Sequence, residues 1–222
     1  MIVIVPTIRH EREFTVLRQW HAQTVPHTLV LLRGPGSAGA KRNAGLRMAR
    51  VCGEEWAVFA DDDNYYGPRY LEEFERAAPD ADVISRGLGF VRNGSELWDF
   101  SARRLGFFPG HSTAVRVAIA PDMPDCTGGE EIPWSRALTA VGPRVTWLPP
   151  TCLVYDRSAG NHGYDSSWPE FLRSFGPGMN LGELPDAYAD SPGDAVGTVE
   201  SASDDAVFRS LEARLFRARG TA

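Results

Sequence analysis

The sequence has only three cysteines, a single lysine and no long apolar run, and each scarcity excludes a class of protein. Cys52, Cys126 and Cys152 form no CxxC pair, which argues against a zinc knuckle or a disulfide framework and predicts buried thiols. The longest apolar runs, MIVIV and HTLVLL, are far too short to cross a bilayer, and no signal peptide is visible. We therefore expect a cytoplasmic protein without a transmembrane segment.

An excess of positive charge is also absent. The net charge at neutral pH is −6, which argues against bulk electrostatic attraction to nucleic acid and leaves only a local arginine patch for that role. Hydrophobic residues make up 43% and charged residues 23% of the chain, as in an ordinary globular protein. A chain of 222 residues is long enough for one large α/β domain with an appendage.

Strand and helix patterns alternate through the first half of the chain. Apolar runs predict strands and helical spacing predicts helices in the following order: strand 1–5, helix 11–22, strand 28–32, helix 40–52, strand 55–60, a helix opened by Pro68, and strand 81–85. Short connections between these elements predict an α/β fold with a mostly parallel central sheet flanked by helices.

The helix expected at 40–52 carries few large apolar side chains. Its buried side is predicted from helical spacing to consist of Ala40, Ala44, Leu46, Met48 and Val51.

The second half of the sequence is more irregular. Its patterns predict a hairpin over 87–100 turned at Asn93-Gly94, a strand over 111–120, a helix over 130–142 and a strand over 144–148. Gly, Pro, Asp and Ser dominate beyond residue 175, which predicts a flexible linker over 176–203. Apolar residues at helical spacing over 204–219 predict an amphipathic helix that docks on the domain or on a second copy, the latter giving a homodimer.

Three segments follow strands of the expected sheet and should meet at one edge. They are Pro6-Thr7, Arg33-Gly34 and the acidic triplet Asp61-Asp62-Asp63. In parallel sheets ligands collect beyond the carboxyl ends of the strands. Three adjacent carboxylates repel one another there, so the triplet predicts a positive partner.

A divalent cation is one candidate for that partner. Asp61 and Asp63 lie two residues apart, can point the same way, and would suit Mg²⁺ or Mn²⁺. The alternative is a solvated acidic turn that caps the helix beginning near Pro68.

The segment SAGAKRNAGL (37–46) also has a ligand-binding pattern. Small residues let a helix N-terminus approach an anion, and Lys41, Arg42 and Asn43 add charge and an amide that suit a diphosphate. The alternative is an ordinary surface helix with basic residues.

Two further candidates lie in the second half. Glu130-Glu131 follows a Gly-Gly pair at the start of a helix, where either acid could serve as a general base or simply complement the helix dipole. His162 lies in a Gly-flanked loop, where it could complete a metal site, although a lone loop histidine is more often incidental.

Taken in order, these segments resemble family 2 glycosyltransferases of the GT-A fold, the nucleotide-diphospho-sugar transferase fold. The resemblance is carried by VIVPTIR (3–9), GAKRNAGL (39–46), WAVFADDDNYYGPRYLEEF (56–74) and GGEEIPWSRALTAVG (128–142). It implies one domain over 1–175, in which 1–85 binds the nucleotide-sugar and a smaller irregular half, 86–175, carries the acceptor side and the base.

The resemblance assigns roles residue by residue. Asp61 and Asp63 would form a DxD-type motif that holds Mg²⁺ or Mn²⁺, His162 would complete the metal or diphosphate site, and Glu131 or Glu130 would be the catalytic base. The remaining donor-site residues would be Pro6, Thr7, Arg9, Arg33, Lys41, Arg42, Asn43 and Asp62. Arg33-Gly34-Pro35-Gly36 stands where family members commonly place an acidic residue, so the nucleotide is open and UDP is the default.

The function implied is metal-dependent, inverting transfer of a sugar from a nucleotide-diphosphate donor to an acceptor hydroxyl. The acceptor is open among a glycan, a protein and a hydroxylated DNA base, and the net charge weighs against the last. Two other functions remain open: a nucleotidyltransferase acting on a sugar phosphate, and a catalytically inactive nucleotide-sugar-binding protein.

Overall fold

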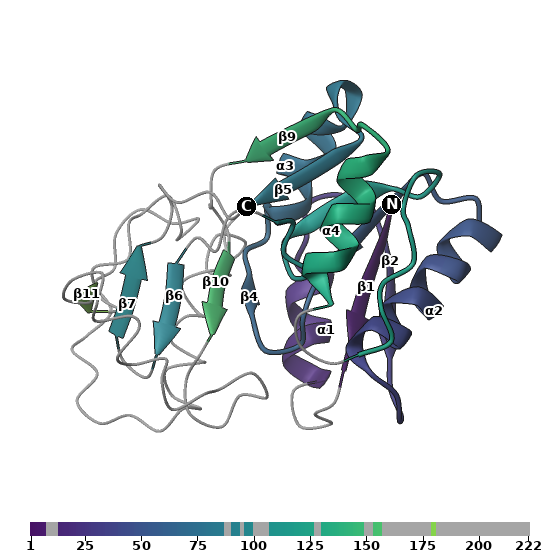
Figure 1. Cartoon of the computed structure of the whole chain (residues 1–222). Coiled ribbons are helices and arrows are strands. Elements are labelled where there is room, and N and C mark those ends of the chain that lie inside the picture. Colours follow the sequence, from purple (N-terminus) through teal and green to yellow (C-terminus); the bar gives the residue numbers. More distant parts are fainter. Residues whose placement is uncertain are drawn as a thin grey trace.

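The computed structural model describes residues 1–7, 13–86, 90–93, 96–99, 107–126, 130–148, 153–156 and 179–180. Within these ranges the chain forms two β-sheets with helices packed against the larger one (Figure 1). The predictions made for Arg9, Cys152, His162 and the segment 204–219 lie outside the described residues. None of the helices that the structure describes is both long and apolar enough to cross a membrane.

The larger sheet has six strands in the order β2-β1-β3-β8-β5-β9. These are β1 (Ile2–Pro6), β2 (Thr28–Leu32), β3 (Trp56–Phe59), β5 (Val83–Arg86), β8 (Thr113–Arg116) and β9 (Val145–Leu148). β2, β1 and β3 run parallel, as do β5 and β9, while β8 lies between β3 and β5 and is antiparallel to both. The mostly parallel α/β sheet predicted from the sequence is confirmed.

Alternate residues of β1 pack into layers on opposite faces of this sheet. Ile2 and Ile4 belong to a core cluster that includes residues of α2 and α4, while Val3 and Val5 belong to one that includes residues of α1 and α3. The helices are α1 (Glu13–His21), α2 (Ala38–Val51), α3 (Tyr70–Ala77), the short 3₁₀ helix η2 (Ala78–Asp80) and α4 (Glu131–Ala140). The sheet therefore lies between two layers of helices, with the core on both of its faces.

The smaller sheet has the order β11-β7-β6-β10-β4 and lies beside the first (Figure 1). Its strands are β4 (Tyr65–Tyr66), β6 (Phe90–Asn93), β7 (Glu96–Asp99), β10 (Leu153–Asp156) and β11 (Met179–Asn180). Asn93 pairs with Glu96, which confirms the hairpin predicted at Asn93-Gly94. The short strands β4, β10 and β11 were not predicted, and β11 comes from the segment 176–203, the rest of which lies outside the described residues.

The buried face of α2 differs from the one predicted. Met48 is 44% exposed and Val51 is 87% exposed, so both were wrongly placed in the core. The residues that α2 buries are Gly39, Lys41, Arg42, Gly45, Leu46 and Ala49. Gly39 and Gly45 allow the helix to pack with this face against its neighbours. A Cβ on Gly45, for example, would come within 2.4 Å of Ile4 Cγ2 in β1. The helix approaches β1 through its small residues and thereby buries two cations.

The prediction of buried thiols is wrong for the two cysteines that the structure describes. Cys52 and Cys126 are both exposed. Cys52 caps the C-terminus of α2, where its N–H donates to Met48 O at 2.9 Å, and Cys126 lies in an irregular segment. Both therefore lie outside the strands and helix interiors that form the core.

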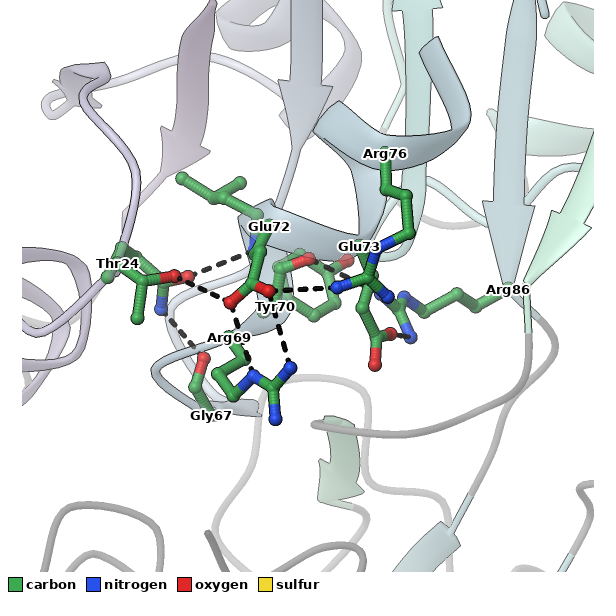
Figure 2. Close-up of polar contacts among 10 residues, drawn as sticks. Thr24, Gly67, Arg69, Tyr70, Glu72, Glu73, Arg76 and Arg86 are labelled. Atoms are coloured by element: carbon green, nitrogen blue, oxygen red, sulfur yellow. Dashed lines mark hydrogen bonds and ion pairs between the residues drawn. The ribbon is translucent and has the colours of Figure 1, made fainter. Parts of the chain in front are cut away.

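Polar contacts join helix α3 to Thr24, which lies between α1 and β2, and to β5 (Figure 2). Glu72 accepts a hydrogen bond from Thr24 Oγ1 at 3.2 Å and pairs with Arg76 at 2.8 Å. Glu73 pairs at 2.5 Å with Arg86, whose side chain is fully buried. These contacts fix the segment that follows the acidic triplet.

Candidate functional site

The ends of β1, β2 and β3 meet at one edge of the larger sheet, as predicted. The Thr7 N–H donates to Leu32 O at 3.0 Å, and the Ala60 N–H donates to Ile4 O at 3.1 Å. Asp61 follows Ala60 directly, so the acidic triplet begins beside the end of β1. Residues 61–64 then lead from β3 of the larger sheet into β4 of the smaller one.

Arg42 lies at the centre of the charged groups on this edge. One guanidinium nitrogen, Nη2, donates to Asp61 Oδ1 at 2.5 Å, and the other, Nη1, binds Glu130 Oε1. Arg42 is 2% exposed. Burial acts to lower the pKa of Arg42, but the charges of Asp61, Glu130 and Glu131 outweigh it and raise that pKa above its usual range. The guanidinium is therefore a permanent cation shared between two acidic motifs 69 residues apart in sequence, from Asp61 to Glu130.

The other two acids of the triplet are each 7% exposed. Asp62 Oδ2 accepts a hydrogen bond from Thr7 Oγ1 at 2.7 Å. Lys41 Nζ donates to the backbone oxygen of Thr7 at 3.1 Å, so the only lysine of the chain secures the turn that holds Asp62. Of the triplet, Asp61 is thus bonded to the cation Arg42, while Lys41 is bonded to the backbone of Thr7.

Tyr66 joins the acidic segment to the second half of the chain. Its hydroxyl accepts a hydrogen bond from the Asp61 N–H at 2.8 Å and donates one to His111 O at 3.0 Å. Burial, with the charge of Asp61 as a second cause, raises the pKa of Tyr66 well above its ordinary value. The hydroxyl therefore stays protonated and can serve as donor and acceptor together.

The two acids at the start of α4 differ in environment. Glu130 is 3% exposed, and its Oε1 is held by Arg42 while its Oε2 has no hydrogen-bond partner among the described residues. Burial raises the pKa of Glu131 above its ordinary value, with Asp61 and Glu130 adding to the rise, while Arg42 and the Gly110 N–H act against it. The surroundings of Glu131 thus favour proton uptake by its carboxylate.

Gly110 fits closely between these charges. A Cβ at this position would come within 3.0 Å of Glu131 Cγ and 3.1 Å of Arg42 Cζ. Gly110 and Tyr66 were not predicted as part of the site, although the Pro-Gly pair at 109–110 is a turn signal and Tyr66 lies three residues after Asp63.

The N-terminus of α2 does not have the free N–H groups predicted for an anion site. The Ala40 N–H donates to the Ser37 side chain at 3.0 Å, the Lys41 N–H to the Ser37 backbone at 3.1 Å, and the Gly39 N–H to Cys126 O at 3.2 Å. A Cβ on Gly39 would lie 1.8 Å from the oxygen of Pro124. The small residues at the start of α2 thus allow residues 124–126 to pack closely against the helix.

Asn43 joins the same segment. Its amide nitrogen donates to Met123 O at 2.8 Å, and its amide oxygen accepts from the Met123 N–H at 2.7 Å. Both ends of the amide are therefore used in holding residues 121–126 against α2.

The remaining predicted residues are placed as follows. Pro6 is the last residue of β1 and pairs with Leu32, and Arg33 is exposed just beyond β2. Within the residues that the structure describes, no group of three or more His, Cys, Asp and Glu side chains is arranged as a metal site. The arrangement brings together Thr7, Lys41, Arg42, Asp61, Asp62, Glu130 and Glu131.

This edge combines two chemical capacities. A raised pKa makes Glu131 suited to accept a proton from a nucleophile. The carboxylates gathered around Arg42 supply oxygen atoms of the type that a hard cation prefers, while Arg42 and Lys41 are themselves buried and already bonded.

Comparison with known proteins supports the fold. No family model matches the chain, and no curated protein matches it significantly in sequence. It is similar in structure to residues 1–349 of TarS from S. aureus in complex with UDP-GlcNAc, with a TM-score of 0.57 and 16% identity over 85% of this chain and 70% of that one. The complex of the same fragment with UDP gives a TM-score of 0.54 and 17% identity over 70% of this chain and 60% of that one.

These neighbours are glycosyltransferases of the GT-A type, and the chain has that fold. The match to the UDP complex spans 60% of the fragment's length. Identities of 16% and 17% establish the fold alone, and the family 2 assignment made from the motifs stays a prediction.

Proposed function

We propose that this protein is a metal-dependent, inverting glycosyltransferase that moves a sugar from a nucleotide-diphosphate donor to an acceptor hydroxyl. The observation that carries the proposal is the meeting of two acidic motifs at Arg42, which binds Asp61 of one and Glu130 of the other. They meet at the carboxyl edge of the sheet, where ligands of α/β folds collect. The UDP and UDP-GlcNAc complexes of TarS, which has the same fold, support a UDP-sugar as donor.

One carboxylate oxygen of Asp61 is of the type that a hard divalent cation prefers. Arg42 occupies Oδ1 of Asp61, whereas Oδ2 accepts no hydrogen bond from the described part of the chain and the side chain is 23% exposed. We propose that Asp61 and Asp63 hold Mg²⁺ or Mn²⁺, with His162 as a further ligand. When bound, the cation would neutralise negative charge that develops on the departing diphosphate.

The chain's own residues supply the base and the donor contacts. Glu131 takes the proton of the acceptor hydroxyl, and the hydroxyl oxygen forms a bond to the anomeric carbon as the bond to the diphosphate oxygen breaks. Attack from the face opposite the leaving group inverts the configuration of that carbon. Glu130 is less suited to this role because Arg42 already holds one of its oxygens in a buried ion pair.

The donor side is formed by the edge of the first half. Thr7 and Lys41 lie beside the triplet, and exposed Arg33 is within the same edge, where it can reach the nucleotide. Asp62 orients Thr7 through their hydrogen bond. Asn43 supports this region indirectly, because both ends of its amide are bonded to the backbone of Met123 and hold residues 121–126 against α2.

Replacing Asp63 with alanine tests the metal assignment. We expect the wild-type protein to bind UDP more tightly with Mn²⁺ than with EDTA, and Asp63→Ala to lose that gain because a ligand of the cation is gone. Calorimetric titration of UDP with and without Mn²⁺ measures the difference, and circular dichroism checks the fold. Asp80→Ala, at an exposed acid in η2, is the control. Undiminished Mn²⁺-dependent binding of UDP by Asp63→Ala would contradict the assignment of Asp63 as a metal ligand.

A further inference from the structure

Tyr66 occupies an unusual position for a core tyrosine. It is 1% exposed, and its ring packs on Trp20 of α1 at a centroid distance of 4.8 Å and on Tyr70 of α3 at 4.9 Å. The aromatic neighbours fix the ring on two sides. Its hydroxyl extends from this aromatic cluster to the backbone of Asp61, the first residue of the acidic triplet.

The hydroxyl makes two backbone hydrogen bonds that span the site. It accepts from the Asp61 N–H at 2.8 Å and donates to His111 O at 3.0 Å. Residue 111 directly follows Gly110, whose N–H contacts the Glu131 carboxylate. One hydroxyl therefore connects the backbone of a proposed cation ligand to the turn that borders the proposed base.

The backbone on the other side of Tyr66 is also held. Gln19 of α1 accepts a hydrogen bond from the Tyr66 N–H at 2.6 Å, and Gln23 donates to Gly67 O at 2.8 Å. Gln23 also accepts from the Leu71 N–H at 3.1 Å. Both glutamines are buried, at 1% and 7% exposure, so these bonds are shielded from water. The position of Tyr66 is thus set by Gln19 of α1 and by Gln23, which follows that helix, independently of any ligand.

We propose that Tyr66 is a positioning residue, whose hydroxyl sets the distance and orientation of Asp61 relative to the Gly110–Glu131 side of the site before a donor or cation binds. This inference rests on the function proposed above. The rigid hydroxyl acts through the Asp61 backbone, while Arg42 holds the side chain of Asp61. Sites that bind cations depend on such supporting hydrogen bonds, whose loss typically costs about 10- to 100-fold in metal affinity or activity.

Tyr66→Phe is the test, because it removes the hydroxyl and keeps the ring that fills the aromatic cluster. We expect faster hydrogen exchange of the Asp61 amide, measured by NMR, and a Mn²⁺ dissociation constant in saturating UDP that is about 10- to 100-fold higher than in the wild type. Tyr70→Phe is the matched control, because it removes another hydroxyl from a fully buried ring of the same cluster. We expect it to leave the Asp61 amide and the Mn²⁺ affinity unchanged.

The outcomes separate this inference from the proposed function. If the wild-type protein binds UDP with no response to Mn²⁺, the metal-dependent function is wrong, and the exchange rate of the Asp61 amide still decides whether Tyr66 holds that backbone. If the wild type responds to Mn²⁺ and Tyr66→Phe binds it equally well, the positioning role is wrong, whether or not the amide exchanges faster. An unchanged Asp61 amide in Tyr66→Phe also contradicts it.

Discussion

Replacing Arg42 with methionine is expected to lower the free energy of unfolding by about 3–5 kcal/mol, the usual effect of breaking a buried ion pair by removing one partner. The guanidinium binds both Asp61 and Glu130, and Glu130 is 3% exposed, so its carboxylate would be left buried beside other acids. Methionine keeps most of the side-chain volume, which makes the lost charge the main change. Guanidinium chloride unfolding followed by tryptophan fluorescence measures the effect.

Arg47→Met is the matched control for this experiment. Arg47 lies on the same helix but is exposed, so its replacement should change the free energy of unfolding by no more than about 0.5 kcal/mol. If Arg42→Met is as stable as Arg47→Met, the central ion-pair network does not contribute to folding. The site would then have to be organised by another group.

Replacing Glu131 with glutamine is expected to reduce turnover by about 10²- to 10⁴-fold, the range attributed to a general base. Nucleotide binding should be retained, because the donor contacts proposed above are assigned to residues around Thr7 and Lys41 and not to Glu131. Initial rates with a UDP-sugar and an active acceptor, alongside calorimetric titration of UDP, measure the two quantities.

The pH dependence of the wild-type enzyme gives a second measure of the same group. Burial raises the pKa of Glu131 above the ordinary value of 4.5, and a base acts only when deprotonated. Turnover should therefore rise with pH through a pKa above 4.5, and fall on acidification sooner than it would with a fully solvated glutamate.

Glu130→Gln separates the two acids. It should weaken the fold through Arg42 but keep the acid limb of the pH profile, because Glu131 remains. If Glu131→Gln keeps wild-type turnover while Glu130→Gln loses the acid limb, the base is Glu130 and the assignment made here is reversed.

The strands of the first half could be predicted because each carries its own signal. β2 has the bounds 28–32 that were predicted, and β3 differs by one residue at each end, because each strand is a short and mostly apolar run. The run of β3 is buried throughout, as expected for a strand covered on both faces, whereas β2 is only partly buried. The insertion of β8 between β3 and β5 could not be predicted, because the neighbours of a strand are set by packing between distant segments. The two-residue strands β4 and β11 are too short to carry a periodic pattern.

The burial of α2 shows where sequence periodicity is misleading. Apolar spacing favoured Met48 and Val51 as buried residues, whereas the helix turns Arg42 inward, to carboxylates at positions 61 and 130. A charge can be buried only where its partners are, and those partners lie far away in sequence. The spacing of apolar side chains along one helix therefore cannot reveal such a face by itself.

The sequence pointed to residues that the structure places near one another, but their roles stay predictions and their connections were not foreseen. The repulsion among Asp61, Asp62 and Asp63 predicted a positive partner, for which a divalent cation was the candidate. The structure pairs Asp61 with Arg42 instead, and the cation stays a prediction. The contacts of Tyr66 and Gly110 could not be predicted, because they involve backbone groups whose positions follow from the fold.

Identifying the product formed from the donor tests the central claim most directly. The protein would be incubated with UDP-GlcNAc and other UDP-sugars, Mn²⁺ and a panel of hydroxyl acceptors, and the phosphorus-containing products followed by ³¹P NMR. We expect release of UDP, dependent on Mn²⁺ and on Glu131, with the sugar transferred to a hydroxyl. The contrary result is no release of UDP from any UDP-sugar, together with formation of inorganic diphosphate in a parallel incubation with nucleoside triphosphates and sugar phosphates.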